Sequence, residues 1–121
     1  MNKAFKGEYI ACSAIYYPHD VVYNAQPKNI ESGFVSLGHR HFNCREQLVH
    51  RFYPNWESEL TKPTEEQVRV KVLRSEIQGF LTNTNRFVDR EEALVIAVNA
   101  DQILENREHG LRDELFSEDI Y

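Results

Sequence analysis

The chain has 121 residues, of which 41% are hydrophobic and 27% charged, and its formal net charge is −5 at neutral pH. These values are typical of one soluble globular domain over residues 1–121 and argue against a disordered chain. The apolar stretches are far shorter than the roughly 20 residues of a membrane-spanning helix, and residues 1–8 lack the apolar core of a signal peptide. Two cysteines, Cys12 and Cys44, are too few for a disulfide framework and favour a reduced, cytosolic setting.

The first half of the chain predicts three short strands and one helix. Residues 8–17 combine β-branched, aromatic and small side chains, a pattern typical of a buried strand. Residues 21–23 would return as the second strand of a hairpin, and residues 33–37 predict a third strand. Apolar residues at helical spacing then predict a helix over residues 44–52, which Pro54 ends nearby.

The second half predicts two further strands and the longest helix. Residues 65–76 predict a helix, and residues 79–83 and 86–88 predict short strands joined by a tight turn. Residues 89–104 carry the clearest helical pattern in the chain. The predicted fold class is therefore α+β, with a mostly antiparallel sheet packed by two or three helices. The acidic tail, about residues 105–121, is predicted to be irregular.

Charge is distributed unevenly along the chain. Residues 1–60 carry six basic and six acidic side chains, whereas residues 61–121 carry eight basic and thirteen acidic ones. Binding to duplex nucleic acid depends largely on neutralising phosphates, so this balance argues against a duplex nucleic-acid binder. Any anion site should be local and small rather than a broad basic face.

Two segments, residues 33–48 and 79–94, align without a gap at an offset of 46 residues. In each, a strand that opens on glycine and a polar turn lead to Asn43 or Asp89, with a glutamate three residues later. That spacing is a capping box, which predicts helix starts at both positions. Duplication and chance similarity remain open as the origin, but the physical interpretation of the two strand–helix junctions is the same.

Metal binding and nucleophilic catalysis are the first chemistries to weigh at the first junction. His39, His41 and Cys44 are acceptable zinc ligands by type, but their spacing matches no standard structural zinc pattern. Cys44 beside histidines at a helix start would suit a thiolate nucleophile, although any histidine-containing helix start has this composition. The chain has neither a Gly-x-Ser-x-Gly elbow nor a glycine-rich phosphate loop. The sequence favours a non-enzymatic protein without metal or cofactor, with a metal- or Cys/His-dependent hydrolase as an alternative.

Anion binding is the third chemistry. Helix starts expose unpaired backbone N–H groups and carry partial positive charge, so basic side chains beside them favour phosphate binding. If the two junctions pack side by side, their basic groups would converge on one ligand, with aromatic rings nearby for a base to stack on. The competing interpretation is that Arg86 or Arg90 pairs with the glutamates at the helix starts. The predicted ligand-binding residues are Arg40, His41, Arg45, Arg86 and Arg90, with Tyr53 and Trp56 as stacking partners.

Two stretches, "GFLTNTNRFVDREEALVIAVNADQI" (79–103) and "LFSEDIY" (115–121), resemble those of a family of small proteins encoded by tailed bacteriophages and prophages. Ile120 stands where that family usually has leucine. The resemblance implies a viral accessory protein acting in the infected bacterial cytoplasm, and it carries no activity over to particular residues.

Compact phage proteins without catalytic motifs often act against host defence. We therefore expect a counter-defence protein that binds and sequesters a phosphorylated, nucleotide-derived small molecule without catalysis. The alternative is a protein-interaction module that inhibits a host defence factor through its acidic surface, as a mimic of nucleic acid. Homo-oligomerisation is compatible with both.

Overall fold

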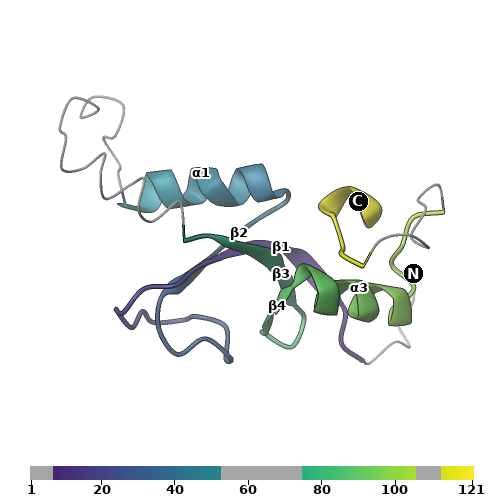
Figure 1. Ribbon diagram of the computed structural model, residues 1–121, viewed down its shortest axis with the longest axis horizontal. Helices are drawn as coiled ribbons and strands as arrows, with labels where there is room; N and C mark the ends of the chain where they lie inside the picture. Colours follow the sequence, from purple (N-terminus) through teal and green to yellow (C-terminus); the bar gives the residue numbers. More distant parts are fainter. Residues whose placement is uncertain (1–6, 53–74, 106–112) are drawn as a thin grey trace.

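The computed structural model describes residues 7–52, 75–105 and 113–121 (Figure 1). In this part of the chain, four strands form one antiparallel sheet in the order β2-β1-β3-β4. The strands are β1 (Ile10–Tyr17), β2 (Phe34–Gly38), β3 (Ile77–Thr82) and β4 (Phe87–Asp89). The helical elements are α1 (His41–Phe52), α3 (Arg90–Asn99) and the short 3-10 helix η1 (Ser117–Asp119). The predicted α+β class is confirmed.

β1 is a central strand, as its composition predicts. Its antiparallel partners are β2 on one side, where Tyr17 pairs with Phe34, and β3 on the other, where Ser13 pairs with Phe80. Successive side chains of a strand point to opposite faces, yet the neighbouring residues Ala14 and Ile15 are both fully buried. Both faces of the sheet are therefore covered at its centre.

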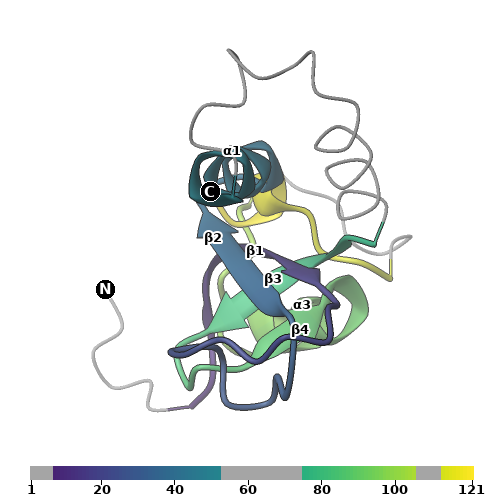
Figure 2. The same ribbon diagram turned by 90° about the vertical axis from the view of Figure 1, so that its left-hand side faces the viewer.

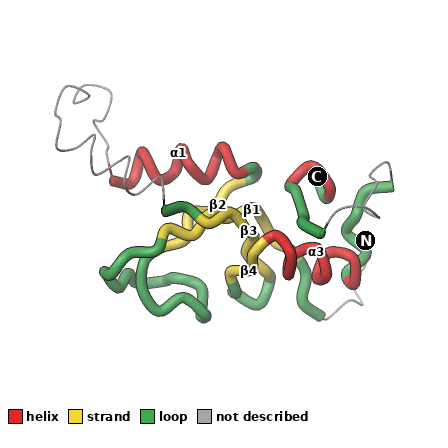
Figure 3. The backbone as a smooth tube through the Cα atoms, in the orientation of Figure 1, coloured by secondary structure: helices red, strands yellow, loops and turns green. Residues whose placement is uncertain are grey.

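Both α-helices pack against the same face of the sheet. Phe80 and its cross-strand partner Val88 form a core cluster with the buried residues of α3. Ile15 and Tyr17 of β1 form a second cluster with Cys44 of α1. Because alternate residues share a face, the pairing of β1 with β3 puts Ile15 and Phe80 on the same side. Segment 113–121 lies beside the start of α1 and next to α3 (Figure 3), and its Leu115 joins the α3 cluster.

The connection between β1 and β2 covers the opposite face (Figure 2). Ile30 of this connection packs against Ala14, Val35 and Phe87, which come from three different strands. Gly33, at the end of the connection, has a φ of 77° and approaches the Tyr17 carbonyl so closely that a Cβ would lie 2.5 Å from its oxygen. Glycine is needed at this strand start, because a side chain here would strain the backbone and clash with β1.

The same connection also closes both edges of the sheet with side-chain amides. At the β2 edge, the backbone N–H of Val35 donates to Gln26 Oε1 at 2.7 Å. At the β4 edge, Asn29 accepts from the Phe87 N–H at 2.9 Å and donates to the Phe87 carbonyl at 2.7 Å. Each amide therefore satisfies backbone groups that a neighbouring strand would otherwise pair.

One of the two predicted capping boxes places its helix start correctly. Asp89 is the N-cap of α3, and its side chain accepts a hydrogen bond from the Glu92 N–H at 2.9 Å. The predicted start of α1 at Asn43 is wrong, because the helix begins at His41 and Asn43 sits in its first turn. There the Asn43 side chain accepts from the backbone N–H of Arg40 at 3.0 Å, so it caps backward instead of forward.

Three other expectations differ from the structure. Residues 21–23 do not form a hairpin strand with β1, because β2 and β3 occupy both sides of β1, and Val22 makes only an isolated bridge to Gly33. The helix predicted over 89–104 ends at Asn99, followed by Asp101 with a φ of 57°. The acidic tail is not irregular throughout, because residues 117–119 form η1 and Leu115 packs on the core. The helix predicted over 65–76 lies almost entirely outside the described residues.

Candidate functional site

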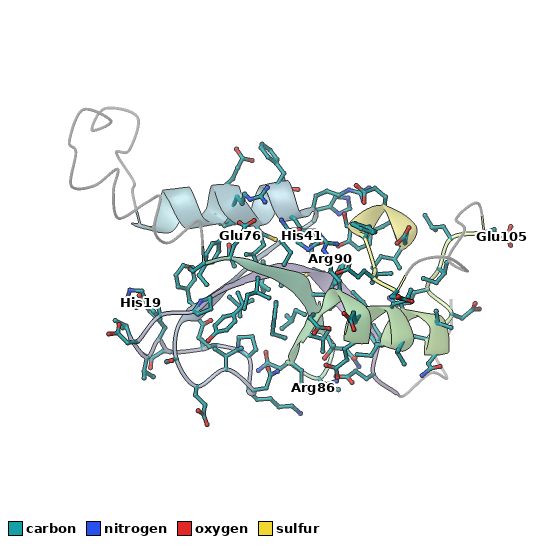
Figure 4. The ribbon with its side chains drawn as sticks, viewed as in Figure 1. His19, His41, Glu76, Arg86, Arg90 and Glu105 are labelled. Atoms are coloured by element: carbon teal, nitrogen blue, oxygen red, sulfur yellow. The ribbon has the colours of Figure 1, made fainter. Side chains whose placement is uncertain are left out.

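The two predicted junctions meet on the helical face of the sheet, where His41 of α1 and Arg90 of α3 are in contact (Figure 4). His41 is the first residue of α1 and is 8% exposed. Arg90 is the first residue of α3 and is half-buried. The distance from Arg90 Nη2 to His41 Nδ1 is 3.3 Å. The convergence expected of the junctions is therefore found for these two side chains.

The contacts of His41 define its protonation state. Its Nε2 lies 2.8 Å from the carbonyl oxygen of Gly79, which can only accept, so Nε2 carries the hydrogen. Its Nδ1 then accepts from Arg90, which is possible only for the neutral ring. Burial, together with the nearby Arg90 and Arg45 guanidinium groups, lowers the His41 pKa, although its bond to Gly79 opposes this. His41 is thus neutral, and its two hydrogen bonds link α1 to β3 and to α3.

Arg90 connects the helical face to segment 113–121. Its Nη1 donates to the carbonyl of Leu115 at 2.7 Å, and its Nη2 also donates to Gln78 Oε1. The guanidinium carbon lies 4.7 Å from the centre of the Phe116 ring, a cation–π distance. The backbone adds a bond from the Leu115 N–H to the Arg90 carbonyl at 2.9 Å. Arg90 therefore uses its planar donor array within the protein.

Tyr121 docks on the first junction. Its hydroxyl accepts from the backbone N–H of Ser13 at 2.9 Å and lies 3.0 Å from Ser13 Oγ. Ser13 Oγ donates to the carbonyl of His39 at 3.0 Å, so the Tyr121 hydroxyl is the donor to Ser13 Oγ. The Tyr121 ring lies 4.5 Å from that of His39 and 5.3 Å from the Arg40 guanidinium carbon. Arg40 also donates to Ser117 Oγ at 3.1 Å.

Arg45 and Arg86 are held by carboxylates. Arg45 makes a bidentate pair with Glu76, with its Nη2 2.5 Å and its Nε 3.0 Å from the two oxygens. Arg86 makes a bidentate pair with Glu8 at 2.7 and 2.8 Å and also lies 2.9 Å from Glu92. The hydrogen bonds from Arg86 hold the Glu8 pKa at about 2. The competing interpretation, pairing with glutamates at the helix starts, matches the contact of Arg86 with Glu92. The bidentate partners Glu8 and Glu76 lie outside the helix starts.

Arg86 also lies apart from the other predicted ligand-binding residues. It sits beside the β3–β4 turn, away from His41 and Arg90 (Figure 4). The structure brings together Arg40, His41 and Arg90 around segment 113–121 and leaves Arg86 out. Tyr53 and Trp56 lie outside the described residues. A ligand-binding role for these residues stays a prediction.

The weak metal candidates do not form one cluster. Cys44 is fully buried in the apolar cluster with Ile15, and burial raises its pKa to about 12. Both ring nitrogens of His41 are used by Gly79 and Arg90, while the exposed His39 stacks on Tyr121. Within residues 7–52, 75–105 and 113–121, no group of three or more His, Cys, Asp or Glu side chains could hold a metal ion.

Two open pockets lie at the edges of this face. One, of about 300 Å³, is lined by Ile77, Gln78, Asp89, Arg90, Glu91 and Glu114, so Arg90 reaches it among three carboxylates. The other, of about 370 Å³, runs along β2 and is lined by uncharged residues, including Gln26, Leu37 and Gln47. Neither collects the predicted arginines around one cavity.

Exposed acidic side chains outnumber basic ones in the described part of the second half. Residues 75–105 and 113–121 contain ten acidic residues and only two basic ones, Arg86 and Arg90. Both arginines are engaged as described above, with carboxylates, backbone and amide groups of the protein itself. Eight of the carboxylate residues are exposed: Asp89, Glu91, Glu92, Asp101, Glu105, Asp113, Glu114 and Glu118.

Sequence reasoning missed the partners that organise this region. Ser13, Gln78 and Tyr121 were not singled out, although each bonds to a residue of a junction or lies beside one. The stretch "LFSEDIY" was a signal for them, because Leu115, Ser117 and Tyr121 of that stretch all pack or bond on the helical face. Its Asp119 is 1% exposed and accepts from the Phe116 N–H at 2.9 Å.

Together, the fold and these contacts define a small two-layer α+β protein. Contacts of Arg40 and Arg90 join the starts of its two α-helices to segment 113–121. A family model described as "Phage T4 y16D protein" matches residues 9–121. The chain therefore belongs to the phage T4 y16D protein family, and the expected phage origin of its family is confirmed. No curated protein and no solved structure matches the chain. None of the helices in the described residues has the length and apolar character needed to cross a bilayer.

Proposed function

We propose that this phage protein works by binding, without catalysis, and that it recognises a basic surface of a host protein through its acidic half. The acidic half is defined as residues 75–105 and 113–121. The observation that carries this proposal is the excess of acidic over basic residues, ten to two in these two ranges and thirteen to eight over residues 61–121 as a whole. Both arginines of the two ranges bond within the protein. Inhibition of a host defence factor is the role that such binding would serve in an infected cell.

The electrostatics favour this partner chemistry. Carboxylates that are exposed and unneutralised produce a negative potential that speeds the encounter with a positively charged surface and repels negative ones. Arg86 neutralises part of the charge of Glu92. Glu105, Asp113 and Glu114 are exposed, with Arg107 and Arg112 near them in sequence. A surface of this kind fits proteins that normally bind nucleic acid.

A second candidate is the binding of a small phosphorylated ligand at the start of α1. It is favoured by one observation: the first turn of α1 contains no acidic residue, and Arg40 lies next to it. The pairing of Arg45 and Arg86 with carboxylates weakens this candidate, because only one side of the expected pocket keeps an available cation. Catalysis by Cys44 is disfavoured because its thiol is buried and its raised pKa keeps it protonated.

The proposal is tested by capture from a bacterial host extract with matched charge reversals. We expect the tagged protein to retain a basic host protein at low salt and to lose it as salt shortens the Debye length below about 10 Å. The variant Glu105→Lys/Glu114→Lys should abolish capture. The control variant Glu31→Lys/Glu46→Lys, which reverses exposed charges outside the acidic half, should retain it.

Capture that is equal in both variants, or no capture by the unaltered protein, would overturn the proposal. The second candidate is measured in parallel by thermal shift with cyclic and ADP-ribose-type nucleotides. A ligand that binds only the folded state raises the melting temperature by several degrees at about 100 times its Kd. A shift that disappears in Arg40→Ala would favour that candidate instead.

A further inference from the structure

One side of α3 packs on the sheet (Figure 1), and part of its exposed side is apolar as well. Its residues 93–98 read ALVIAV, six consecutive apolar positions. Ala93, Ile96 and Ala97 are buried against the sheet, as the spacing predicts. Val95 and Val98 point away from it and are 60% and 54% exposed. A helix that covers one face of a sheet normally presents polar side chains on the other, so this second apolar stripe needs another explanation.

The folded domain gains little from valine at these two positions. A β-branched side chain loses rotamer freedom in a helix, so valine is a poorer helix former than alanine, lysine or glutamate. With more than half of their surfaces exposed, Val95 and Val98 recover little of this by burial within the domain. Their chemistry therefore points to burial against another molecule.

Charges around the stripe indicate what that molecule is. Glu91 lies four residues before Val95, so Glu91, Val95 and Val98 share one face of α3, with the exposed Asp101 just beyond the helix. A second copy of the chain would bring its own Glu91 and Asp101 to the same place, and like charges would oppose pairing. A partner with apolar side chains in the middle and lysine or arginine around them would match both features.

We propose that this face of α3 docks an amphipathic, basic segment of a partner protein. The inference rests on the proposed function and narrows it, because it names the contact surface and the type of segment that binds there. The valines would supply the apolar centre of the interface, and the carboxylates around them its polar rim.

The test uses a synthetic amphipathic helix of leucine and lysine, about four helical turns long. A second peptide keeps the lysines and replaces the leucines with serine. By fluorescence anisotropy, we expect the Kd for the leucine peptide to be at least about tenfold lower than the Kd for the serine peptide. Val95→Ala/Val98→Ala should remove that preference.

The variant also reports on folding. Alanine is the better helix former, so the thermal stability of Val95→Ala/Val98→Ala should equal or slightly exceed that of the unaltered protein. If the domain itself needed the two valines, the thermal stability of the variant would fall. Val22→Ala is the matched control, since Val22 is 75% exposed and lies outside α3, and it should leave the peptide affinity unchanged.

Equal affinity for the two peptides, or a leucine preference that survives in Val95→Ala/Val98→Ala, would overturn the inference. So would a concentration-dependent dimer that the same double variant dissociates, because the stripe would then bind a second copy. Charge-dependent capture from host extract that persists in Val95→Ala/Val98→Ala would retain the proposed function and reject this docking surface. If the unaltered protein captured no host protein, the proposed function itself would be rejected.

Discussion

Removing the Tyr121 hydroxyl should destabilise the protein by about 1 to 3 kcal/mol. Tyr121→Phe keeps the ring against His39 and Arg40 and deletes only the oxygen that accepts from the Ser13 N–H and donates to Ser13 Oγ. Ser13 is fully buried, so its backbone N–H would lose its partner without access to water. The expected loss corresponds to the cost of a buried unsatisfied donor, which exceeds the net value of an ordinary hydrogen bond.

Tyr17→Phe is the matched control for this prediction. Tyr17 is fully buried as well, but among the described residues its hydroxyl has no partner that meets hydrogen-bond geometry, so removing it should be neutral or stabilising. In urea denaturation, Tyr121→Phe should therefore lower the midpoint, and Tyr17→Phe should leave it unchanged or raise it, with unchanged m-values for both. A domain of this size is expected to have about 5 to 15 kcal/mol of stability, so the Tyr121 effect is measurable. Equal midpoints for the two variants, or a Tyr121→Phe loss below about 0.5 kcal/mol, would refute the reasoning.

Two further outcomes follow from the junctions. The pKa of His41 in the folded state is lowered from 6.5, so the unfolded chain takes up a proton at this histidine more readily than the folded protein does. The free energy of unfolding should therefore be greatest above pH 6.5 and fall as the pH drops toward the folded-state pKa. His41→Gln should flatten that decline in denaturation curves taken across this pH range, and a pH profile identical to that of the unaltered protein would contradict the assignment. Asp89→Ala should cost about 1 kcal/mol in urea denaturation because the Glu92 N–H loses its cap. Asp113→Ala, an exposed carboxylate outside any helix start, should change the midpoint little, and an equal loss would speak against the cap.

The sequence was most informative where local chemistry decides the structure. The β-branched and aromatic residues of 8–17 predicted a buried strand, which the structure has at Ile10–Tyr17, and Asp89 predicted the start of α3 through its own cap. It failed where distant residues decide. Residues 21–23 have a strand-like composition, but β3, some 60 residues further along the chain, takes the place beside β1 that they would need. α1 begins at His41 because the Arg40 carbonyl accepts the first helical bond there, from Cys44.

The candidate site was predictable in its residues but not in their partners. The sequence identified Arg40, His41 and Arg90, which the fold does assemble around segment 113–121. It could not decide whether Arg86 would face a ligand or a carboxylate, because Glu8 lies 78 residues away. Segment 113–121 was misjudged because its carboxylates suggested solvation, whereas Leu115 and Asp119 are buried by contacts that only the tertiary structure supplies.

The amides of Gln26 and Asn29 have a consequence for how this protein avoids aggregation. They occupy opposite edges of the sheet, yet both belong to one short stretch of the connection between β1 and β2. A local opening of that stretch would therefore uncover both edges at once, and each would become a template on which another chain could add a strand. Opening of this one connection would expose both edges of the sheet to pairing with strands of other chains.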